Sequence, residues 1–249
     1  YTHTEGLPYE GDTFTGALET TADKDKAGIY DITQGTLTLG SNYNIVFTPG
    51  TYTVEDKLPQ DSFAFKDVVD GKVTKTYGDA DFTVAATDEA EGSSVSYEST
   101  NTNVATVDST GKVTIHAAGT TTIKATAHET KDYAEKKIFY TLTVKPRTLT
   151  KAALTYSGPI TKVYDGSNSA PRGLTVSVKP DSLVGDDTLA VNGTLKYNSA
   201  NVSEADTITF TPDAITEGNY RLAAAEVLTI TGASITKATP TYKKPTGVT

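Results

Sequence analysis

The chain lacks three residue types altogether. It contains no Cys, no Met and no Trp, and only three of its 249 residues are His. Without Cys it has neither a disulfide framework nor a thiolate metal site, and this content is compatible with secretion. His3, His116 and His128 form no closely spaced pair of the kind that binds zinc. We therefore interpret them as surface or strand-end residues and assign no metal ligand.

Long apolar runs and positive charge are also missing. No segment approaches the roughly 20 apolar residues needed to cross a bilayer, so no membrane-spanning segment is predicted in this fragment. The net charge of −9 argues against nucleic acid and against anionic lipid as partners. The chain begins at Tyr1 without an initiator Met or a leader, which indicates a piece cut from a longer protein.

Motifs for catalysis are not found either. The chain has no Gly-x-Ser-x-Gly elbow and no Gly-rich phosphate loop. A thin sandwich offers little cleft for the paired carboxylates of a glycosidase. We therefore predict that the protein is not an enzyme, with no catalytic, cofactor-binding or metal-binding residue and no cofactor.

Carboxylates do gather in a few places. The clusters are Asp79, Asp81 and Asp88-Glu89; Asp186-Asp187; and Glu19, Asp23, Asp25 and Asp31. Calcium prefers six to eight oxygen ligands, often from alternating acidic residues of one loop. Asp79 and Asp81 alternate, but no complete calcium-loop spacing follows them. The prediction is a solvated acidic face, with a structural calcium ion as the alternative.

What the chain does have is short β-branched segments bounded by Gly, Asp, Asn or Pro, a pattern typical of strands and tight turns. Strands are predicted at 113–116, 120–127, 139–144, 174–178, 207–210 and 227–230. Hairpin turns are predicted at Ser109-Thr110-Gly111 and at Val191-Asn192-Gly193. Helix is limited to single turns near 199–206 or 88–91. The pattern predicts an all-β fold.

Three markers repeat along the chain with one period of about 88 residues. Strand-end segments close at Val54, Val144 and Ile230, and a Lys-x-Tyr motif occurs at Tyr77 and, 87 residues later, at Tyr164. An Asn-Tyr pair precedes a final hairpin at Tyr43 and again at Tyr220. We expect each Lys-x-Tyr tyrosine to pack its ring over the end of a sandwich and to bond its hydroxyl to backbone.

The period sets the expected modules. They are residues 1–56, 57–145 and 146–237, with 238–249 as a linker or the start of another unit. The first is much shorter than the period, so we expect it to lack opening strands and to be either open or completed by a neighbour. The junction Val144-Lys145-Pro146-Arg147 is short and stiffened by Pro. Tandem immunoglobulin-like β-sandwiches in an elongated array are therefore predicted.

Each expected module resembles a known family. Residues 99–108, 111–115 and 118–126 are similar to the bacterial Ig-like domain of group 2. Tyr164-Asp165-Gly166, Gly218-Asn219-Tyr220 and Ile235-Thr236-Lys237-Ala238 resemble the YDG module. Segments 28–37, 42–45 and 47–54 are similar to the C-terminal half of the MBG module. The resemblance implies a large secreted or cell-surface bacterial protein in which such modules act as stalks and spacers, beside flanking modules of the same protein.

Two alternatives stay open at this point. An adhesin module would bind a host or cell-surface glycan or protein through exposed tyrosines, for which the candidates are Tyr30, Tyr43, Tyr52, Tyr133 and Tyr140. Most such tyrosines serve as cross-strand packing partners. A self-formed Lys–Asn or Lys–Asp amide bond is the other alternative, and it requires a buried Lys beside its partner.

Overall fold

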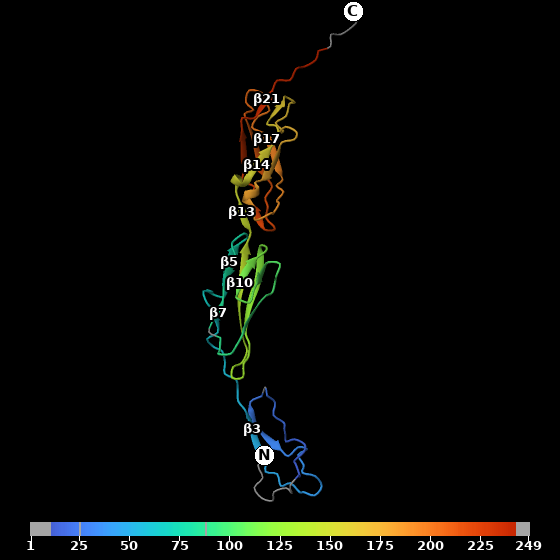
Figure 1. Cartoon of the computed structure of the whole chain (residues 1–249). Coiled ribbons are helices and arrows are strands. Elements are labelled where there is room, and N and C mark those ends of the chain that lie inside the picture. Colours follow the sequence, from blue (N-terminus) through green and yellow to red (C-terminus); the bar gives the residue numbers. More distant parts are fainter. Residues whose placement is uncertain (1–10, 25, 88, 243–249) are drawn as a thin grey trace, which may run out of the picture. The chain divides into compact units, whose positions relative to one another are not determined.

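The computed structural model describes residues 11–24, 26–87 and 89–242, and nearly all of its regular structure is β (Figure 1). This confirms the all-β prediction. The chain divides into two compact units. The first contains residues 1–62, 89–94 and 127–136, and the second contains residues 63–88, 95–126 and 137–249.

The first unit contains one antiparallel sheet in the order β1-β2-β3. Its strands are β1 (Glu19–Thr20), β2 (Gly28–Thr33) and β3 (Gly50–Val54). Side chains of β2 alternate between half-buried and exposed, as expected for a sheet with one covered face. That cover is slight, since Tyr52, which lies opposite Tyr30 on the covered face, is 51% exposed.

A buried glutamine holds the end of this unit together. Gln60 donates from Nε2 to the carbonyl oxygen of Ala134 at 2.8 Å, and its Oε1 accepts from the amide of Ala90 at 3.0 Å. Leu58 makes a parallel bridge to Tyr133, in which Leu58 N–H donates to Asp132 at 2.8 Å. Segments 89–94 and 127–136 therefore cluster with residues up to 62 rather than with their neighbours in sequence.

The second unit begins with a two-layer sandwich. Its strands are β4 (Ala64–Phe65), β5 (Lys72–Thr76), β6 (Phe82–Thr83), β7 (Ala86–Thr87), β8 (Val95–Ser99), β9 (Ala105–Val107), β10 (Lys112–Ile115), β11 (Gly119–Ala127) and β12 (Lys136–Lys145). One sheet has the order β5-β12-β11-β8 and the other β6-β10-β9. Val113 of β10, Ile123 of β11 and Leu142 of β12 are fully buried in one cluster, so the two sheets enclose a common core.

The same unit continues into a second sandwich. Its elements are β13 (Arg147–Leu149), the 3-10 helix η1 (Lys151–Ala153), β14 (Leu154–Ser157), β15 (Thr161–Val163), β16 (Thr175–Val178), the 3-10 helix η2 (Pro180–Ser182), β17 (Gly193–Tyr197), β18 (Thr207–Pro212), β19 (Tyr220–Leu222), β20 (Leu228–Thr231) and β21 (Ser234–Thr236). Ile208 and Phe210 of β18 are buried while Thr209 is partly exposed, the alternation that a covered strand requires.

Both sandwiches pair an early strand with their last strand in parallel. Strand β5 pairs with β12 so that Thr76 faces Lys145, and β15 pairs with β21 so that Val163 faces Thr236. In each case the residue after the early strand donates its backbone amide to the carbonyl oxygen of the last paired residue. Tyr77 donates to Lys145 and Tyr164 to Thr236, both at 2.8 Å. The two tyrosines therefore occupy equivalent places in their sandwiches.

The six predicted strands all overlap observed strands, and the turn at Ser109-Thr110-Gly111 is present with Gly111 at φ +79°. The turn predicted at Val191-Asn192-Gly193 is wrong, because Gly193 opens β17. A Cβ at Gly193 would lie 2.7 Å from the ring of Phe210, so this glycine provides space rather than a positive φ.

Of the predicted helical turns, the one near 199–206 corresponds to a hydrogen-bonded turn at 201–205. The two short 3-10 helices of the described residues, η1 and η2, were not predicted. Asp88, in the other predicted turn, lies outside the described residues.

Candidate functional site

The two histidines of the described residues have separate partners. His116 Nε2 lies 2.9 Å from Thr106 Oγ1, and His128 Nδ1 lies 4.0 Å from a carboxylate oxygen of Glu135. His3 lies outside the described residues. In the part of the chain that the structure describes, no three His, Asp or Glu side chains are placed so that they could hold a metal ion.

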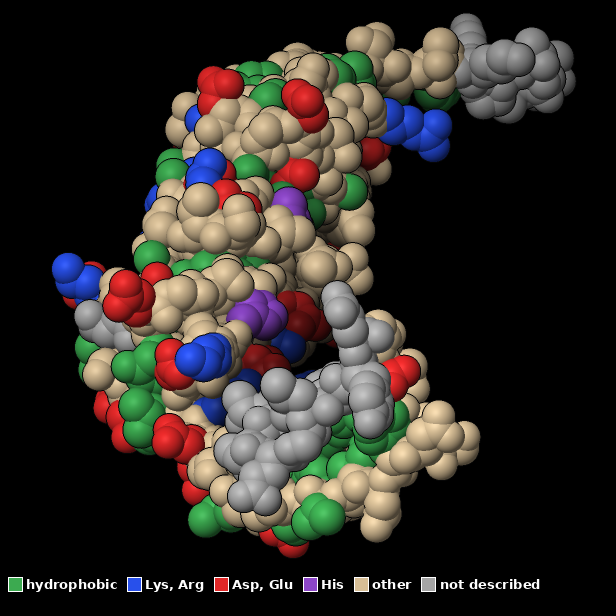
Figure 2. All heavy atoms as spheres, turned by 60° about the horizontal axis from the view of Figure 1, so that its bottom comes forward, with side chains coloured by type: hydrophobic (Ala, Val, Ile, Leu, Met, Phe, Trp, Pro, Cys, Tyr) green, Lys and Arg blue, Asp and Glu red, His purple; other side chains and the backbone are tan. Residues whose placement is uncertain are grey.

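The acidic clusters are occupied by local contacts. Asp81 forms an ion pair with Lys112 at 2.9 Å, which lowers the pKa of Asp81, and Asp79 Oδ2 accepts from the backbone amide of Thr76 at 2.8 Å. Acidic and basic side chains are interspersed on the face shown in Figure 2. Asp25 and Asp88 lie outside the described residues.

The five tyrosines considered for glycan binding have different surroundings. Tyr140 is 1% exposed and packs edge-on against Phe65 at 4.9 Å, so its candidacy was wrong. Its burial follows from its place in β12, where alternate side chains face the core. Tyr43 donates to Asp12 at 2.6 Å, and Tyr133 is half-buried. Tyr30 and Tyr52 are direct cross-strand partners on one face of the β2–β3 pair.

The most developed polar site of the described residues lies where the two sandwiches of the second unit meet. We call it the joint and define it as Tyr77, Gly78, Val184, Asp187, Asn219 and Tyr220. Tyr77 and Gly78 directly follow β5, and Asn219 and Tyr220 stand at the start of β19. Val184 and Asp187 lie in the loop after η2.

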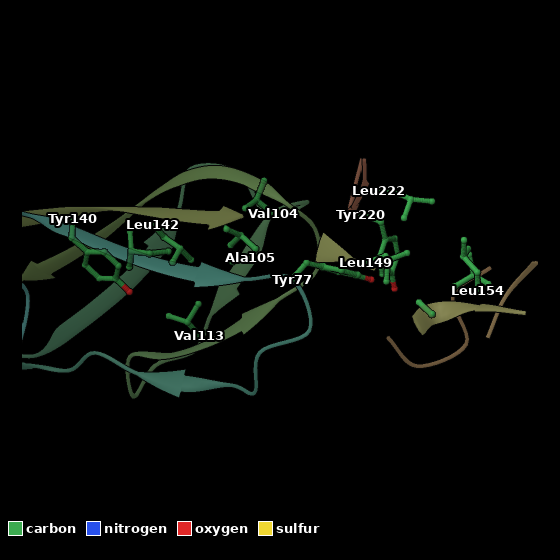
Figure 3. Packing of buried hydrophobic residues seen from close by; sticks show 14 of the residues in the cluster. Tyr77, Val104, Ala105, Val113, Tyr140, Leu142, Leu149, Leu154, Tyr220 and Leu222 are labelled. Atoms are coloured by element: carbon green, nitrogen blue, oxygen red, sulfur yellow. The ribbon is translucent and has the colours of Figure 1, made fainter. Parts of the chain in front are cut away.

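One carboxylate joins the two tyrosines. The hydroxyls of Tyr77 and Tyr220 both donate to Asp187 Oδ2, at 2.9 and 2.7 Å. The Tyr220 oxygen also accepts from the backbone amide of Val184 at 2.8 Å. The two rings pack edge to face with centroids 5.7 Å apart, and Figure 3 shows Tyr77 directed toward Tyr220 and Leu149. Hydrogen bonds to a charged acceptor are stronger than neutral ones, so this arrangement favours a single geometry.

Backbone groups reinforce the joint. Arg147 donates its amide to the carbonyl oxygen of Asn219 at 2.8 Å, and Asn219 Oδ1 accepts from the amide of Ala118 at 2.8 Å. A Cβ at Gly78 would lie 2.5 Å from Cγ2 of Val184. Glycine at 78, with φ +90°, therefore allows Val184 to pack directly against the backbone.

Burial changes the acidity of both hydroxyls. Desolvation and the bond to Asp187 raise the pKa of Tyr77, and the same causes raise the pKa of Tyr220 to about 12. The neutral hydroxyl is therefore the stable form, and it acts as a donor to the carboxylate.

The apolar core runs through the joint without a break. One cluster of buried side chains contains Val113 and Leu142 of the first sandwich together with Leu149, Phe210 and Tyr220 of the second (Figure 3). The cluster also contains Tyr77, which is 8% exposed. The two sandwiches therefore share apolar surface as well as hydrogen bonds.

The sequence analysis found some of this site. It marked Tyr77, Asn219-Tyr220 and Asp186-Asp187, and the structure brings Tyr77, Asn219, Tyr220 and Asp187 together. The predicted hydroxyl partner was wrong for Tyr77, because a carboxylate from the next sandwich replaces backbone. Tyr164 was expected to pack over a sandwich end but is 45% exposed.

One repeat of the marker was missed. Asp132-Tyr133 stands 87 residues before Asn219-Tyr220 and takes the same place in its sandwich. The carbonyl of Asp132 accepts from Leu58, as that of Asn219 accepts from Arg147. The regular spacing was the available signal, but Asp in place of Asn hid it.

Successive β-sandwiches joined through a buried aromatic contact place the protein in the class of tandem immunoglobulin-like modules. Three family models match in tandem along the chain. They are the MBG domain (YGX type) at residues 1–53, the bacterial Ig-like domain (group 2) at 63–138 and the YDG domain at 145–230. The chain therefore carries the three kinds of module that the sequence analysis named.

Among solved structures, the chain is similar to surface layer protein SbsC, domains 4-9, at 17% identity over 86% of its length with a TM-score of 0.24. It is also similar to the S-layer protein rSbsC, at 16% identity over 88% of its length with a TM-score of 0.27. It spans 36% of each of those chains. No curated protein matches it. Within the described residues, no helix has the length and apolarity to cross a membrane.

Proposed function

We propose that the chain is a non-catalytic stalk or spacer segment of a large secreted or cell-surface bacterial protein. The observation that carries this proposal is the joint, where Asp187 links tyrosines from two consecutive sandwiches. A spacer must hold its modules in a constant orientation, and a buried contact does this better than a flexible tether. The three matched families, which are repeat modules rather than enzymes, support the same conclusion.

The proposed modules are residues 57–145 and 146–237, preceded by the partial module 1–56 and followed by 238–249 as a linker or the start of another unit. One apolar core continues through residues 142–154, which supports treating modules 57–145 and 146–237 as mechanically coupled neighbours. The junction Lys145-Pro146-Arg147 contains no Gly or Ser that would let them separate.

Residual dipolar couplings measured by NMR on the full chain test this proposal. Amides of β8–β12 and of β14–β20 should fit a single alignment tensor, because the joint makes the two sandwiches one rigid body. Asp187→Ala removes the shared acceptor, and the two sets should then need separate tensors. Asp186→Ala deletes the neighbouring exposed carboxylate and should leave the single tensor intact.

Two independent tensors in the unmodified chain would contradict the stalk proposal, since the modules would then reorient freely. If Asp186→Ala needs two tensors while Asp187→Ala keeps one, then the negative charge of this loop, rather than the hydrogen bonds to Asp187, holds the joint.

A second candidate function rests on a different observation. Tyr30 and Tyr52 face each other across β2 and β3, and Tyr52 is 51% exposed. The Tyr30 ring lies over Gly28, where a Cβ would come within 3.3 Å of it, and its hydroxyl donates to the carbonyl of Lys26 at 3.0 Å. A pair of tyrosine rings on one sheet face is a platform on which a sugar can stack, as an adhesin would require.

Glycan-array binding by the full chain decides this candidate. Binding that is lost in Tyr30→Ala and Tyr52→Ala but kept in Tyr156→Ala, an exposed tyrosine of the second unit, would support an adhesin. Absence of binding by the unmodified chain would eliminate it and leave the stalk.

A further inference from the structure

The end of module 146–237 that carries Tyr164 has the same construction as the end of module 57–145 that carries Tyr77. Both Tyr77 and Tyr164 come one residue after a strand that pairs in parallel with the module's last strand. Each tyrosine donates its backbone amide at 2.8 Å to the last paired residue of the module's last strand, Tyr77 to Lys145 and Tyr164 to Thr236. A glycine with positive φ comes directly after Tyr77 and two residues after Tyr164, Gly78 at +90° and Gly166 at +80°.

The two ends differ in what covers them. Tyr77 is 8% exposed beneath Tyr220 and Asp187, whereas Tyr164 is 45% exposed and Val163 before it is 59% exposed. Tyr164 borders a hollow lined also by Val202, Lys237 and Ala238. A Cβ at Gly166 would meet nothing within 4 Å, so no side chain packs against this glycine as Val184 packs against Gly78.

The charges at this end suit an incoming carboxylate. Lys237 lines the hollow beside Tyr164 and so provides a positive charge at this end, as Arg147 provides one in the joint, where its Nη1 lies 3.1 Å from a Cβ built at Gly78. The negative charge of Asp165 is already engaged, because Lys162 Nζ donates to it at 2.7 Å and the amide of Ser167 at 2.9 Å. These bonds lower the pKa of Asp165 to about 2.

We propose that Tyr164, Gly166, Val202 and Lys237 form a docking surface for a further β-sandwich module whose leading end presents an Asp carboxylate and an Asn-Tyr pair. The incoming Asp accepts from the Tyr164 hydroxyl and lies near Lys237, and the incoming tyrosine packs edge to face on the Tyr164 ring. The inference rests on the proposed stalk function, because it uses the same joint a second time.

A lengthened chain provides the test. Residues 1–237 are followed directly by a second copy of residues 147–249, so that Lys237 is kept and Arg147 stands two residues after Thr236, as it stands two residues after Lys145. The second copy carries Tyr164→Phe, so that only the first Tyr164 reports. Tetranitromethane nitrates accessible tyrosines, and mass spectrometry of peptides gives the extent at each one.

Nitration of Tyr164 is expected to fall at least about fivefold from its value in the 249-residue chain, because a docked tyrosine reacts only when the joint opens. Asp187→Ala in the second copy should restore the reaction, and Asp186→Ala in the second copy should not. Tyr197, 2% exposed, should stay unreactive in every variant and so shows that both copies are folded.

The outcomes separate the two proposals. If Tyr77 is protected and Tyr164 reacts as in the shorter chain, the docking surface is overturned while the stalk stands. If Tyr77 also reacts freely, the joint does not persist in solution and both proposals fail. If Asp186→Ala restores the reaction as fully as Asp187→Ala does, the assigned carboxylate is wrong.

Discussion

At the scale of single residues, the tyrosine hydroxyls separate into groups by what they contact. Tyr77 and Tyr220 bond to a carboxylate, and Tyr197 lies 2.9 and 3.0 Å from the carbonyl oxygens of Ile160 and Ser234. The hydroxyl of Tyr140 is buried without a hydrogen-bond partner among the described residues. A buried donor that lacks a partner opposes folding, whereas one with a partner supports it.

Tyr140→Phe and Tyr197→Phe should therefore act in opposite directions. Removing the Tyr140 hydroxyl should leave the free energy of unfolding unchanged or raise it by up to about 1 kcal/mol, since an unpaired polar group is lost. Removing the Tyr197 hydroxyl should lower it by about 1–3 kcal/mol, since two carbonyls lose their donor. Urea denaturation of both variants measures the difference, and equal destabilisation would contradict it.

The ionisation of the joint tyrosines gives a second prediction. A pKa raised in the folded state means that the neutral hydroxyl stabilises the fold below about pH 10. This contribution is lost as the pH rises through the folded-state pKa, which is about 12 for Tyr220. Tyrosinate absorbance should show late titration by Tyr77, Tyr140, Tyr197 and Tyr220, whose pKa values are all raised.

The variant Asp187→Ala should advance part of this titration. Two of the four late hydroxyls lose a bond that raises their pKa, so about half of the late amplitude should move to lower pH. The titration of Asp186→Ala should match that of the unmodified chain. An unchanged curve for Asp187→Ala would show that burial alone sets these pKa values.

At the scale of elements, the sheets differ in how much core they cover. Strands β11 and β12 contain Ile123, Leu142 and Val144, all nearly inaccessible, whereas β3 has four exposed residues out of five. The stability of a strand against local opening follows the contacts that cover it. The sheet of the first unit should therefore open most readily.

Amide hydrogen exchange on the full chain measures this difference. Amides of β11 and β12 should exchange at least about a hundredfold more slowly than those of β2 and β3, because β2 and β3 open locally while the covered strands open only with the whole unit. Comparable protection in both units would mean that the first unit has cover that its exposed residues do not indicate.

The elements also show what the sequence can and cannot predict. Strands such as 120–127 and 207–210 were predicted because alternation is a local property of the chain. The parallel pairing of β5 with β12 joins residues about 70 positions apart, and no local pattern encodes it. Gly193 was misassigned for the same reason, since Phe210 decides its role. Asp187 looked like solvated charge because its two tyrosine partners lie 110 and 33 residues away.

At the scale of the whole molecule, the joint should make two modules unfold as one. The shared core and the bonds to Asp187 couple the sandwiches, and each bond to a charged acceptor contributes about 1.5–3 kcal/mol. Differential scanning calorimetry of the full chain should show a single transition for the second unit. Asp187→Ala should divide it into two, while Asp186→Ala should not. Two transitions in the unmodified protein would contradict the coupling.

The parallel pairing of terminal strands determines how a module of this kind responds to tension. A pull transmitted to the next module leaves each sandwich along its last strand, so the load acts along β12 or β21 and shears its bonds to the parallel neighbour. Bonds loaded in shear share the force and rupture together instead of unzipping in sequence. The β5–β12 ladder joins five residue pairs and the β15–β21 ladder joins three. Under force the sandwich that ends in β21 should therefore yield first and act as an extensible element, while the one that ends in β12 keeps its length.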